Sequence, residues 1–265
     1  MKKQINSLLL AGILVLVMVL SGSVAGLITK DIKAQIIFSG VSVETQNTVK
    51  AFARKNFIFL FRYPEEILQM HDRNKETEEF VLNYPIEKNK KHVIDESIIS
   101  REEVPLFIQW DKRWGYLEFG SGVAGYTACG PICLSMVAYY FTGDRNVLPD
   151  KILDFTVDNG YYLKGTGARW SLFTEGGEKL GLKVEEIPIE ETDVKNAMES
   201  GKVIIASMDK GDFTTKGHFI VFVDYSDGLL KVNDPNSYVR SNKKWEFEAI
   251  KDQIKCLWAV NKKEI

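Results

Sequence analysis

The chain has 265 residues, of which 45% are hydrophobic, and this is enough to build one sizeable core with an appendage. Its 34 basic and 36 acidic residues give a formal net charge of -2, so it lacks the basic excess that nucleic-acid binding requires. The three histidines do not combine with the three cysteines at metal-site spacing, and no stretch frames a dinucleotide-binding loop. We therefore expect neither a metal nor another cofactor.

The chain begins with a basic and then apolar segment. Two lysines precede an apolar run from Leu8 to Leu20, and small residues from Ser21 to Ala25 follow it. This pattern is typical of a secretory signal that is cut after Ala25. The run is shorter than the roughly 20 apolar residues of a spanning helix, but its continuation to Ile28 leaves an uncleaved anchor as the alternative. We expect residues 1–25 to be a signal peptide or a membrane anchor, and any membrane contact to be made by this segment alone.

Residues 26–100 form a second region that is rich in charged helical patterns. Two helical stretches are predicted, Thr48–Phe61 and Pro64–Leu82, separated at Tyr63-Pro64 because proline interrupts a helix. Their apolar residues are enough for a small helical unit followed by a linker. We interpret the region as a structural arm, with a removable inhibitory pro-segment as the alternative.

Residues 101–265 mix helices with later strands, which indicates an α+β domain. Apolar spacing predicts one helix over Gly130–Phe141 and another around Ala168–Leu180. Short β-rich runs predict the strands, which are Val203–Met208, Phe219–Val223, Leu229–Val232 and Leu257–Val260.

Cys129 lies where the first of these helices should begin. Pro131 follows it at a position where the first helical turn tolerates a missing N–H, and apolar residues continue with broadly helical spacing. The positive end of a helix stabilises a thiolate, which is the nucleophilic form of cysteine. Cys129 is therefore a candidate nucleophile, and a buried cysteine that packs as a small apolar group is the alternative.

A predicted β-hairpin near the C-terminus supplies a histidine and an acid. Two β-rich runs flank a turn that contains Asp227-Gly228, and Pro235 ends the second run. If Val223 lies opposite Leu229, the same register places His218 opposite Asp234. Directly opposed side chains point to one face of a sheet, so the carboxylate would orient the imidazole. A slip of one residue would turn Asp234 to the other face.

These residues have the chemistry of acyl transfer through a thioester. Cys129 would attack a carbonyl carbon, His218 would hold its proton and return it to the leaving group, and Asp234 would fix the imidazole. Gln109 precedes the nucleophile and carries two amide N–H donors. Together with the backbone N–H of Cys129, it would cradle the developing oxyanion.

Four motifs in this order resemble the stand-alone relatives of bacteriocin-leader-processing cysteine peptidases, which are double-glycine peptidase-like proteins. The resemblance covers roughly residues 100–260 and implies a papain-like fold, with Gln109, Cys129, His218 and Asp234 in the family's roles. Ala128 departs from the pattern because the family has glycine or aspartate before the cysteine. The motifs are Val104 to Gly115, Ala128-Cys129-Gly130-Pro131, Gly217-His218-Phe219 and Asn233-Asp234-Pro235-Asn236-Ser237.

We therefore expect an exported cysteine peptidase that is secreted or attached to the extracytoplasmic face of the membrane, and whose substrate is a peptide or another amide. The alternatives are a peptidoglycan amide hydrolase that acts on cell-wall peptide, an acyl transferase, and a peptide-binding domain without activity.

The other two cysteines, Cys133 and Cys256, lie among apolar neighbours. We expect them to be buried thiols, with a disulfide between them as the alternative.

Overall fold

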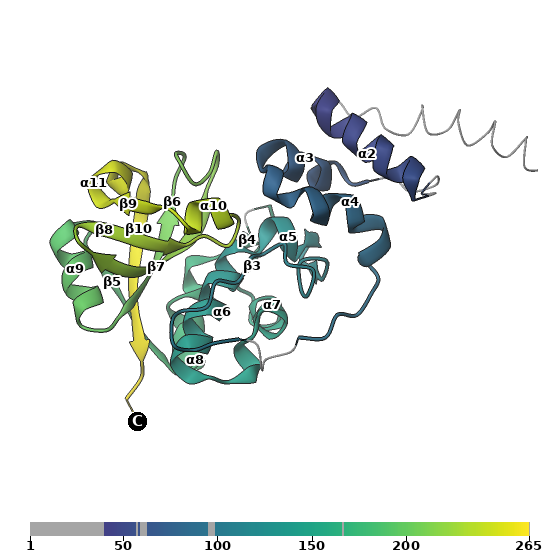
Figure 1. Cartoon of the computed structure of the whole chain (residues 1–265). Helices are drawn as coiled ribbons and strands as arrows, with labels where there is room; N and C mark the ends of the chain where they lie inside the picture. Colours follow the sequence, from purple (N-terminus) through teal and green to yellow (C-terminus); the bar gives the residue numbers. More distant parts are fainter. Residues whose placement is uncertain (1–39, 57, 59–62, 95–98, 166, 265) are drawn as a thin grey trace, which may run out of the picture. The chain divides into compact units, whose positions relative to one another are not determined.

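The computed structural model describes residues 40–56, 58, 63–94, 99–165 and 167–264. The chain divides into two compact units, Met1–Lys75 and Glu76–Ile265, which we describe one at a time (Figure 1). The predicted signal segment lies outside the described residues. Within the described ranges, no helix is both long enough and apolar enough to cross a membrane.

The first unit contains two helices, α2 (Val43–Lys55) and α3 (Glu65–Arg73). Ser42 caps α2 by accepting a hydrogen bond from the Thr45 N–H, and both residues also bond to the Asp72 carboxylate of α3. The second predicted stretch, Pro64–Leu82, is not one helix, because the backbone becomes extended at Asn74. A 3₁₀ turn, Lys75–Thr77, follows, and then α4 (Glu78–Glu87) begins in the second unit.

The second unit is built around a six-stranded antiparallel sheet. The strand order is β5-β10-β6-β7-β8-β9, so the last long strand inserts between two earlier ones. The strands are β5 (Leu182–Ile187), β6 (Val203–Met208), β7 (His218–Ser226), β8 (Leu229–Asn233), β9 (Lys244–Glu246) and β10 (Ile254–Lys262).

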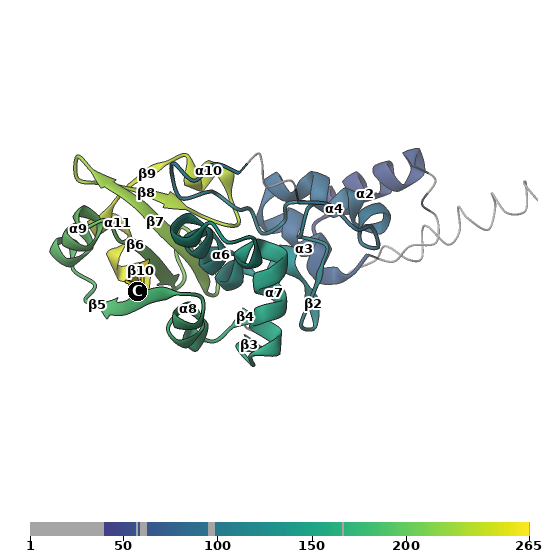
Figure 2. The same ribbon diagram turned by 90° about the horizontal axis from the view of Figure 1, so that it is seen from below.

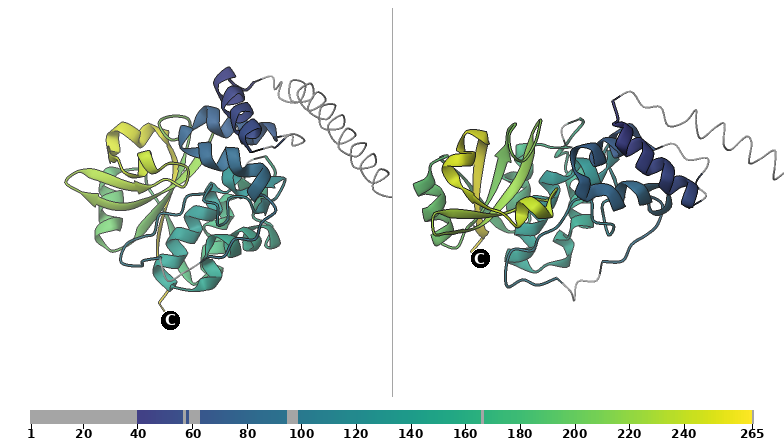
Figure 3. Two further views of the ribbon diagram at one scale, coloured as in Figure 1. Left: turned by 45° about the vertical axis from the view of Figure 1, so that its right-hand side comes forward. Right: turned by 45° about the horizontal axis from the view of Figure 1, so that its top comes forward.

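Both faces of the sheet are covered, which explains why its central strands are apolar at consecutive positions. On one face, Val203 and Ile205 of β6 belong to a core shared with the helices α6 (Cys129–Thr142) and α7 (Pro149–Asp158). On the other face, the alternate residues Ile204, Ala206 and Met208 belong to a second core. This core is shared with the helices α9 (Glu191–Glu199) and α11 (Phe247–Ile250). Figure 2 shows α6 beside the sheet and α7 next to α6. Figure 3 shows the teal helices on one side of this unit and the green to yellow strands on the other.

Helix α6 runs through the interior of the second unit. Every residue from Gly130 to Tyr139 is buried, as expected for a helix that is apolar on all sides. It ends at Gly143, whose φ of 66° is the left-handed conformation that glycine adopts without strain. The predicted helix over Gly130–Phe141 is therefore confirmed to within one residue at each end.

The predicted helix around Ala168–Leu180 is wrong. The segment instead forms β4 (Gly167–Ala168), a 3₁₀ turn (Trp170–Leu172) and the short helix α8 (Glu175–Lys179). Ala168 pairs with Tyr162 of β3 (Tyr162–Leu163), and the strand interaction overrides the helical pattern. The remaining short elements are β1 (Glu118–Phe119), β2 (Gly122–Val123), α5 (Ala124–Thr127), α10 (Tyr238–Ser241) and the 3₁₀ turns Arg145–Val147 and Lys251–Gln253.

The β7–β8 hairpin forms with a register that differs from the predicted one. Val221 pairs with Asn233, two residues further along β8 than expected, and Leu229 pairs with Ser226. The cause lies in the turn, where Asp227-Gly228 alone connects the strands with φ values of 55° and 75°. Such a two-residue turn extends β7 to Ser226 and leaves a local irregularity in the ladder.

Candidate active site

Cys129 is the first residue of α6 and is partly buried. The preceding residue, Ala128, has φ -99° and ψ 21°, so the chain turns sharply from α5 into α6. The first N–H groups of a helix have no partner within the helix, and the backbone N–H of Cys129 is one of them. The predicted nucleophile therefore lies beside an available donor at the positive end of a buried helix.

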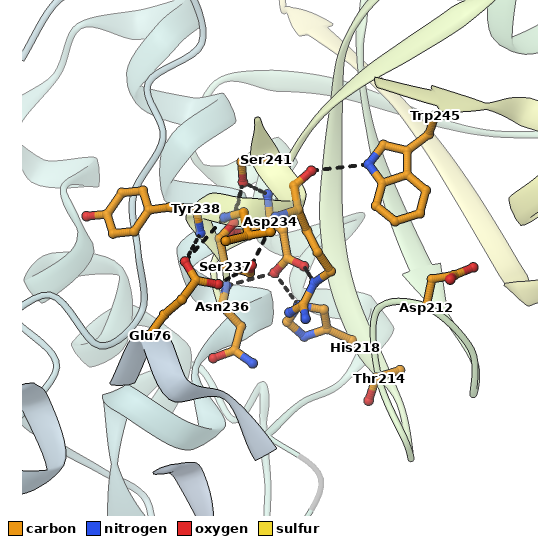
Figure 4. A network of polar contacts seen from close by, with 12 residues as sticks. Glu76, Asp212, Thr214, His218, Asp234, Asn236, Ser237, Tyr238, Ser241 and Trp245 are labelled. Atoms are coloured by element: carbon orange, nitrogen blue, oxygen red, sulfur yellow. Dashed lines mark hydrogen bonds and ion pairs between the residues drawn. The ribbon is translucent and has the colours of Figure 1, made fainter. Parts of the chain in front are cut away.

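His218 lies between Cys129 and Asp234. It is the first residue of β7, is 7% exposed, and pairs with Met208 of β6. Its Nε2 lies 2.8 Å from Asp234 Oδ1 (Figure 4), and Cys129 lies close enough to contribute to the raised pKa of the imidazole. Because Asp234 engages Nε2, the remaining ring nitrogen, Nδ1, is the one available to the thiol.

The surroundings of His218 favour the imidazolium form. Burial alone would lower the pKa of the imidazole, but the charge of Asp234, its hydrogen bond and the contact with Cys129 raise the pKa to about 10. A thiol that gives its proton to such an imidazole becomes a thiolate beside a cation. The arrangement suits a nucleophile with an acid ready for the leaving group.

Asp234 is completely buried and accepts three hydrogen bonds. The donors are His218 Nε2, the backbone N–H of Asn236 at 2.7 Å and Arg240 Nε at 2.5 Å. Burial by itself raises the pKa of a carboxyl group, but the charges and hydrogen bonds of His218 and Arg240 outweigh it, so the pKa of Asp234 is lowered. The carboxylate is therefore held ionised between two cationic side chains.

The predicted direct opposition of His218 and Asp234 across the hairpin is wrong. β8 ends at Asn233, so Asp234 lies just beyond the ladder in the turn that leads to α10. The register is shifted by three residues at the turn, but the irregularity between Phe222 and Asp224 reduces the shift to two on the side of His218, and an even shift leaves each residue on its predicted face. Asn233 fixes this end of the strand by donating from Nδ2 to the Val104 carbonyl oxygen at 2.9 Å.

Gln109 connects both sides of the site and is 4% exposed. Its backbone N–H donates to the Pro235 carbonyl oxygen at 2.7 Å, beside Asp234. Its side-chain Nε2 donates to the Gly125 carbonyl oxygen at 2.8 Å, in the helix α5 that leads to Cys129. An amide nitrogen has two protons, and one of them remains for a substrate oxygen. The role of Gln109 in an oxyanion hole stays a prediction.

Two polar residues that sequence reasoning did not single out belong to the same network. Arg240 bonds to Asp234, and its carbonyl oxygen accepts from Trp245 Nε1 at 3.1 Å. Glu76 bonds to Ser237, 161 positions away in the sequence (Figure 4). Arg240 follows Ser237 at the spacing of a helix cap, a weak local signal. No local pattern connects Glu76 with this turn.

The other two cysteines are free and buried. Burial, followed by the influence of Cys129 and Asp234, raises the pKa of the Cys133 thiol well above its usual value. Burial and Glu186 raise the pKa of Cys256 to about 12. The structure therefore agrees with the prediction of two buried thiols. Among the residues that the structure describes, no cluster of three or more histidine, cysteine, aspartate or glutamate side chains is arranged to hold a metal ion.

A family model and two solved structures are similar to parts of this chain. The model of the Peptidase_C39 like family matches residues 101–264. One similar solved structure is the peptidase domain of Streptococcus ComA, a bi-functional ABC transporter involved in a quorum sensing pathway, with 18% identity and a TM-score of 0.41 over 52% of this chain and 93% of that chain. Another is a putative C39-like peptidase from Bacillus anthracis, with 12% identity and a TM-score of 0.37 over 63% of this chain and 98% of that chain. No curated protein matches the sequence.

Proposed function

The chain belongs to the Peptidase_C39 like family, and from this premise we propose that it is an exported cysteine peptidase that hydrolyses a peptide or amide bond through Cys129, His218 and Asp234. The observation that carries the proposal is the position of His218, which bonds to Asp234 at 2.8 Å and lies close enough to Cys129 for the two side chains to interact electrostatically. The three groups come from a helix, a strand and a turn that the fold brings together.

The proposed reaction has two halves. The Cys129 thiolate attacks the carbonyl carbon, and the backbone N–H of Cys129 with the spare Nε2 proton of Gln109 stabilises the oxyanion. The tetrahedral intermediate collapses, the C–N bond breaks, and the leaving amine takes the proton from His218. Water then attacks the thioester and gives a proton to His218, the C–S bond breaks, and the carboxylic acid leaves as the Cys129 thiolate is restored beside the protonated His218.

Export rests on the N-terminal sequence. The lysines, the apolar run from Leu8 to Leu20 and the small residues that end at Ala25 support a secreted or membrane-attached protein. The test is to express the full chain and to determine its location and its N-terminal residue by cell fractionation and mass spectrometry. A mature N-terminus at Gly26 outside the cytoplasm supports cleavage, an intact N-terminus in the membrane supports the anchor, and full-length protein in the cytoplasm contradicts export.

Thiol labelling tests the proposed catalytic group. The protein without residues 1–25 is treated with iodoacetamide across pH, and the wild type is compared with Cys129→Ala and His218→Ala. We expect labelling at neutral pH that is faster than that of a free thiol, is lost in Cys129→Ala and is slower in His218→Ala. Slow labelling that does not depend on His218 would instead favour a binding domain without activity.

Product analysis tests the proposed reaction. The same protein is incubated with a peptide library, with purified cell-wall fragments and with each of these plus an amine acceptor. Cleaved peptides that are absent with Cys129→Ala support a peptidase. Release of wall peptides alone would indicate a peptidoglycan amide hydrolase, and products that carry the added amine would indicate an acyl transferase.

A further inference from the structure

Residues 76–87, which comprise Glu76, Thr77 and α4, lie outside the stretch that matches the family model. That match begins at residue 101, yet the compact unit that contains the candidate active site begins at Glu76. We call residues 76–87 the brace. Two of the contacts between the brace and the rest of the unit each lead to one candidate catalytic residue.

The first contact is made by the Glu76 carboxylate. It accepts hydrogen bonds from Ser237 Oγ, from the Tyr238 N–H at 2.8 Å and from the Val239 N–H at 3.2 Å (Figure 4). These groups form the start of α10, where backbone donors lack partners within the helix. One carboxylate therefore satisfies three donors of the same turn.

This turn also carries the group that holds the catalytic acid. Ser237 Oγ accepts from the Arg240 N–H at 3.0 Å, and Arg240 Nε donates to Asp234 Oδ2 at 2.5 Å. Ser241 Oγ closes the turn from the other end by accepting from the Asp234 N–H at 2.9 Å. Movement of α10 would therefore move the carboxylate that orients the imidazole.

The second contact is made by Phe80 of α4. Its ring stacks on Tyr116 with centroids 4.2 Å apart, and Tyr116 Oη donates to the Phe80 carbonyl oxygen at 2.9 Å. The ring also fills the space beside Gly115 and Gly125, where an added Cβ would lie 2.8 Å and 2.5 Å from it. Gly125 supplies the carbonyl oxygen that binds the Gln109 side chain.

We propose that the brace positions the catalytic groups of this peptidase, with Glu76 holding the turn of Asp234 and Phe80 holding the backbone that orients Gln109. The inference rests on the proposed function, because it concerns the same catalytic groups. Glu76 and Phe80 are positioning residues, since they act through α10 and α5 and not on the substrate. The brace is accordingly a permanent part of the catalytic unit, which argues against a removable inhibitory pro-segment that includes it.

The test compares Glu76→Gln with Glu79→Gln in the full chain. Both changes remove one negative charge from the same segment, but Glu79 is exposed, and the hydrogen bonds to Ser237, Tyr238 and Val239 are made by Glu76. The readout is the pH dependence of Cys129 labelling by iodoacetamide. With Glu76→Gln, we expect the neutral-pH rate to fall about tenfold to a hundredfold, because small displacements of catalytic groups have effects of that order. With Glu79→Gln, we expect the wild-type profile.

The outcomes separate this inference from the proposed function. If the wild type itself labels no faster than a free thiol, the proposed function fails and the brace fails with it. If Cys129 of the wild type is labelled faster than a free thiol and Glu76→Gln has the same profile at every pH, only the proposed positioning role of the brace is overturned. A lower melting temperature without a change of the pH profile also overturns it, because that result describes a structural role alone.

Two further variants keep the test decisive. Ser237→Ala removes the same contact from the other side, so the double variant with Glu76→Gln should label no more slowly than the slower single variant. Fully additive losses would show that the two residues act separately and would overturn the coupling. If Glu76→Gln does not fold, Phe80→Leu tests the other contact. A slower reaction of folded Phe80→Leu supports the brace, and an unchanged rate overturns it.

Discussion

Asp234 is shared between two cations, and this sharing explains how a fully buried carboxylate stays ionised. An unpaired buried charge is costly, whereas His218 and Arg240 both bond to this one within 2.8 Å. The contact of Arg240 with Asp234 also affects how the carboxylate faces His218. Because Arg240 occupies Oδ2, Oδ1 remains directed at the imidazole, and the side chain of Asp234 cannot rotate without breaking both contacts.

Asp234→Asn should uncouple the imidazole from the thiol. The substitution keeps the shape of the side chain but removes the charge that raises the pKa of His218, so this pKa should fall towards its ordinary value of about 6.5. We expect the rate of Cys129 alkylation at about pH 8 to fall on the order of tenfold or more. Asp224→Asn, at an exposed position of the same hairpin, is the control. Equal rates in the two variants would contradict the prediction.

The same ion pair should make stability depend on pH. The folded protein binds the His218 proton more tightly than the unfolded chain does, so its contribution is complete below pH 6.5 and is lost as the pH rises towards about 10. The measurement uses Cys129→Ala, which removes the proton of the Cys129 thiol; because Cys129 also helps to raise the pKa of His218, the loss should end below pH 10 in this variant. We expect the free energy of unfolding in urea to fall by about 1 kcal/mol per pH unit above 6.5.

The control for this measurement adds His218→Gln to Cys129→Ala, which should remove the slope. The series should stop near pH 9, the ordinary pKa of a thiol. Above it, Cys133 and Cys256 would add their own loss, because both have raised pKa values in the fold and ionise more readily when unfolded. A stability that does not change between pH 6.5 and this limit would contradict the assignment of a cationic His218.

At the scale of elements, the β3–β4 hairpin is packed against the segment that leads to the nucleophile. Gly167 of β4 has a φ of 102°, and an added Cβ would lie 2.5 Å from the Thr127 carbonyl oxygen, two residues before Cys129. Only glycine satisfies both conditions, because other residues avoid this φ and the neighbouring atom belongs to the backbone. The position of β4 is thus linked to the position of the thiol.

Gly167→Ala should impair the site, and Gly165→Ala provides a matched control. Gly165 also has a positive φ of 80°, but an added Cβ there meets nothing within 4 Å. Both variants should lose about 1 kcal/mol of stability from the strained backbone. Only Gly167→Ala should also slow the alkylation of Cys129, by about tenfold or more, because its Cβ displaces the chain beside the nucleophile. Similar alkylation rates in the two variants would show that the contact has no influence on the thiol.

The sequence predicted helices and strands correctly where the local pattern of apolar residues alone determines the structure. The run after Pro131 is apolar on all sides, and it forms the buried helix that was expected. Ala168 was assigned to a helix because its cross-strand partner, Tyr162, is not apparent from the local pattern. The register of the β7–β8 hairpin was wrong for a similar reason, since it depends on which residues enter the turn. The predicted proximity of His218 and Asp234 held because the irregularity between Phe222 and Asp224 turned an error of three residues at the turn into an even error of two.

At the scale of the whole molecule, the boundary of the folded unit could not be predicted. Charge and apolar content in residues 26–100 indicated helices but not which of them belong to the second unit. That assignment depends on Glu76 and Phe80, whose partners lie far along the chain. The domain boundary at residue 100 remains a prediction, because the family match begins at residue 101 and the compact unit begins at Glu76.

Truncation should show which boundary matters for folding. A chain that starts at residue 101 loses α4 and exposes the face of Tyr116 that Phe80 covers, whereas a chain that starts at residue 76 keeps both. Phe80 is 4% exposed, so the loss of its burial should lower the free energy of unfolding by ~2 kcal/mol or more. Urea unfolding of the two chains gives the difference. Equal stabilities would show that α4 adds nothing to the fold.

The three cysteines lie in two kinds of environment, and this allows folded molecules to be counted. Cys129 is partly exposed at the proposed site, whereas Cys133 and Cys256 are buried thiols with raised pKa values. A short exposure to an alkylating reagent should add one label to each folded molecule and three to each unfolded one. The intact mass of a preparation would then report its folded fraction before any substrate has been identified.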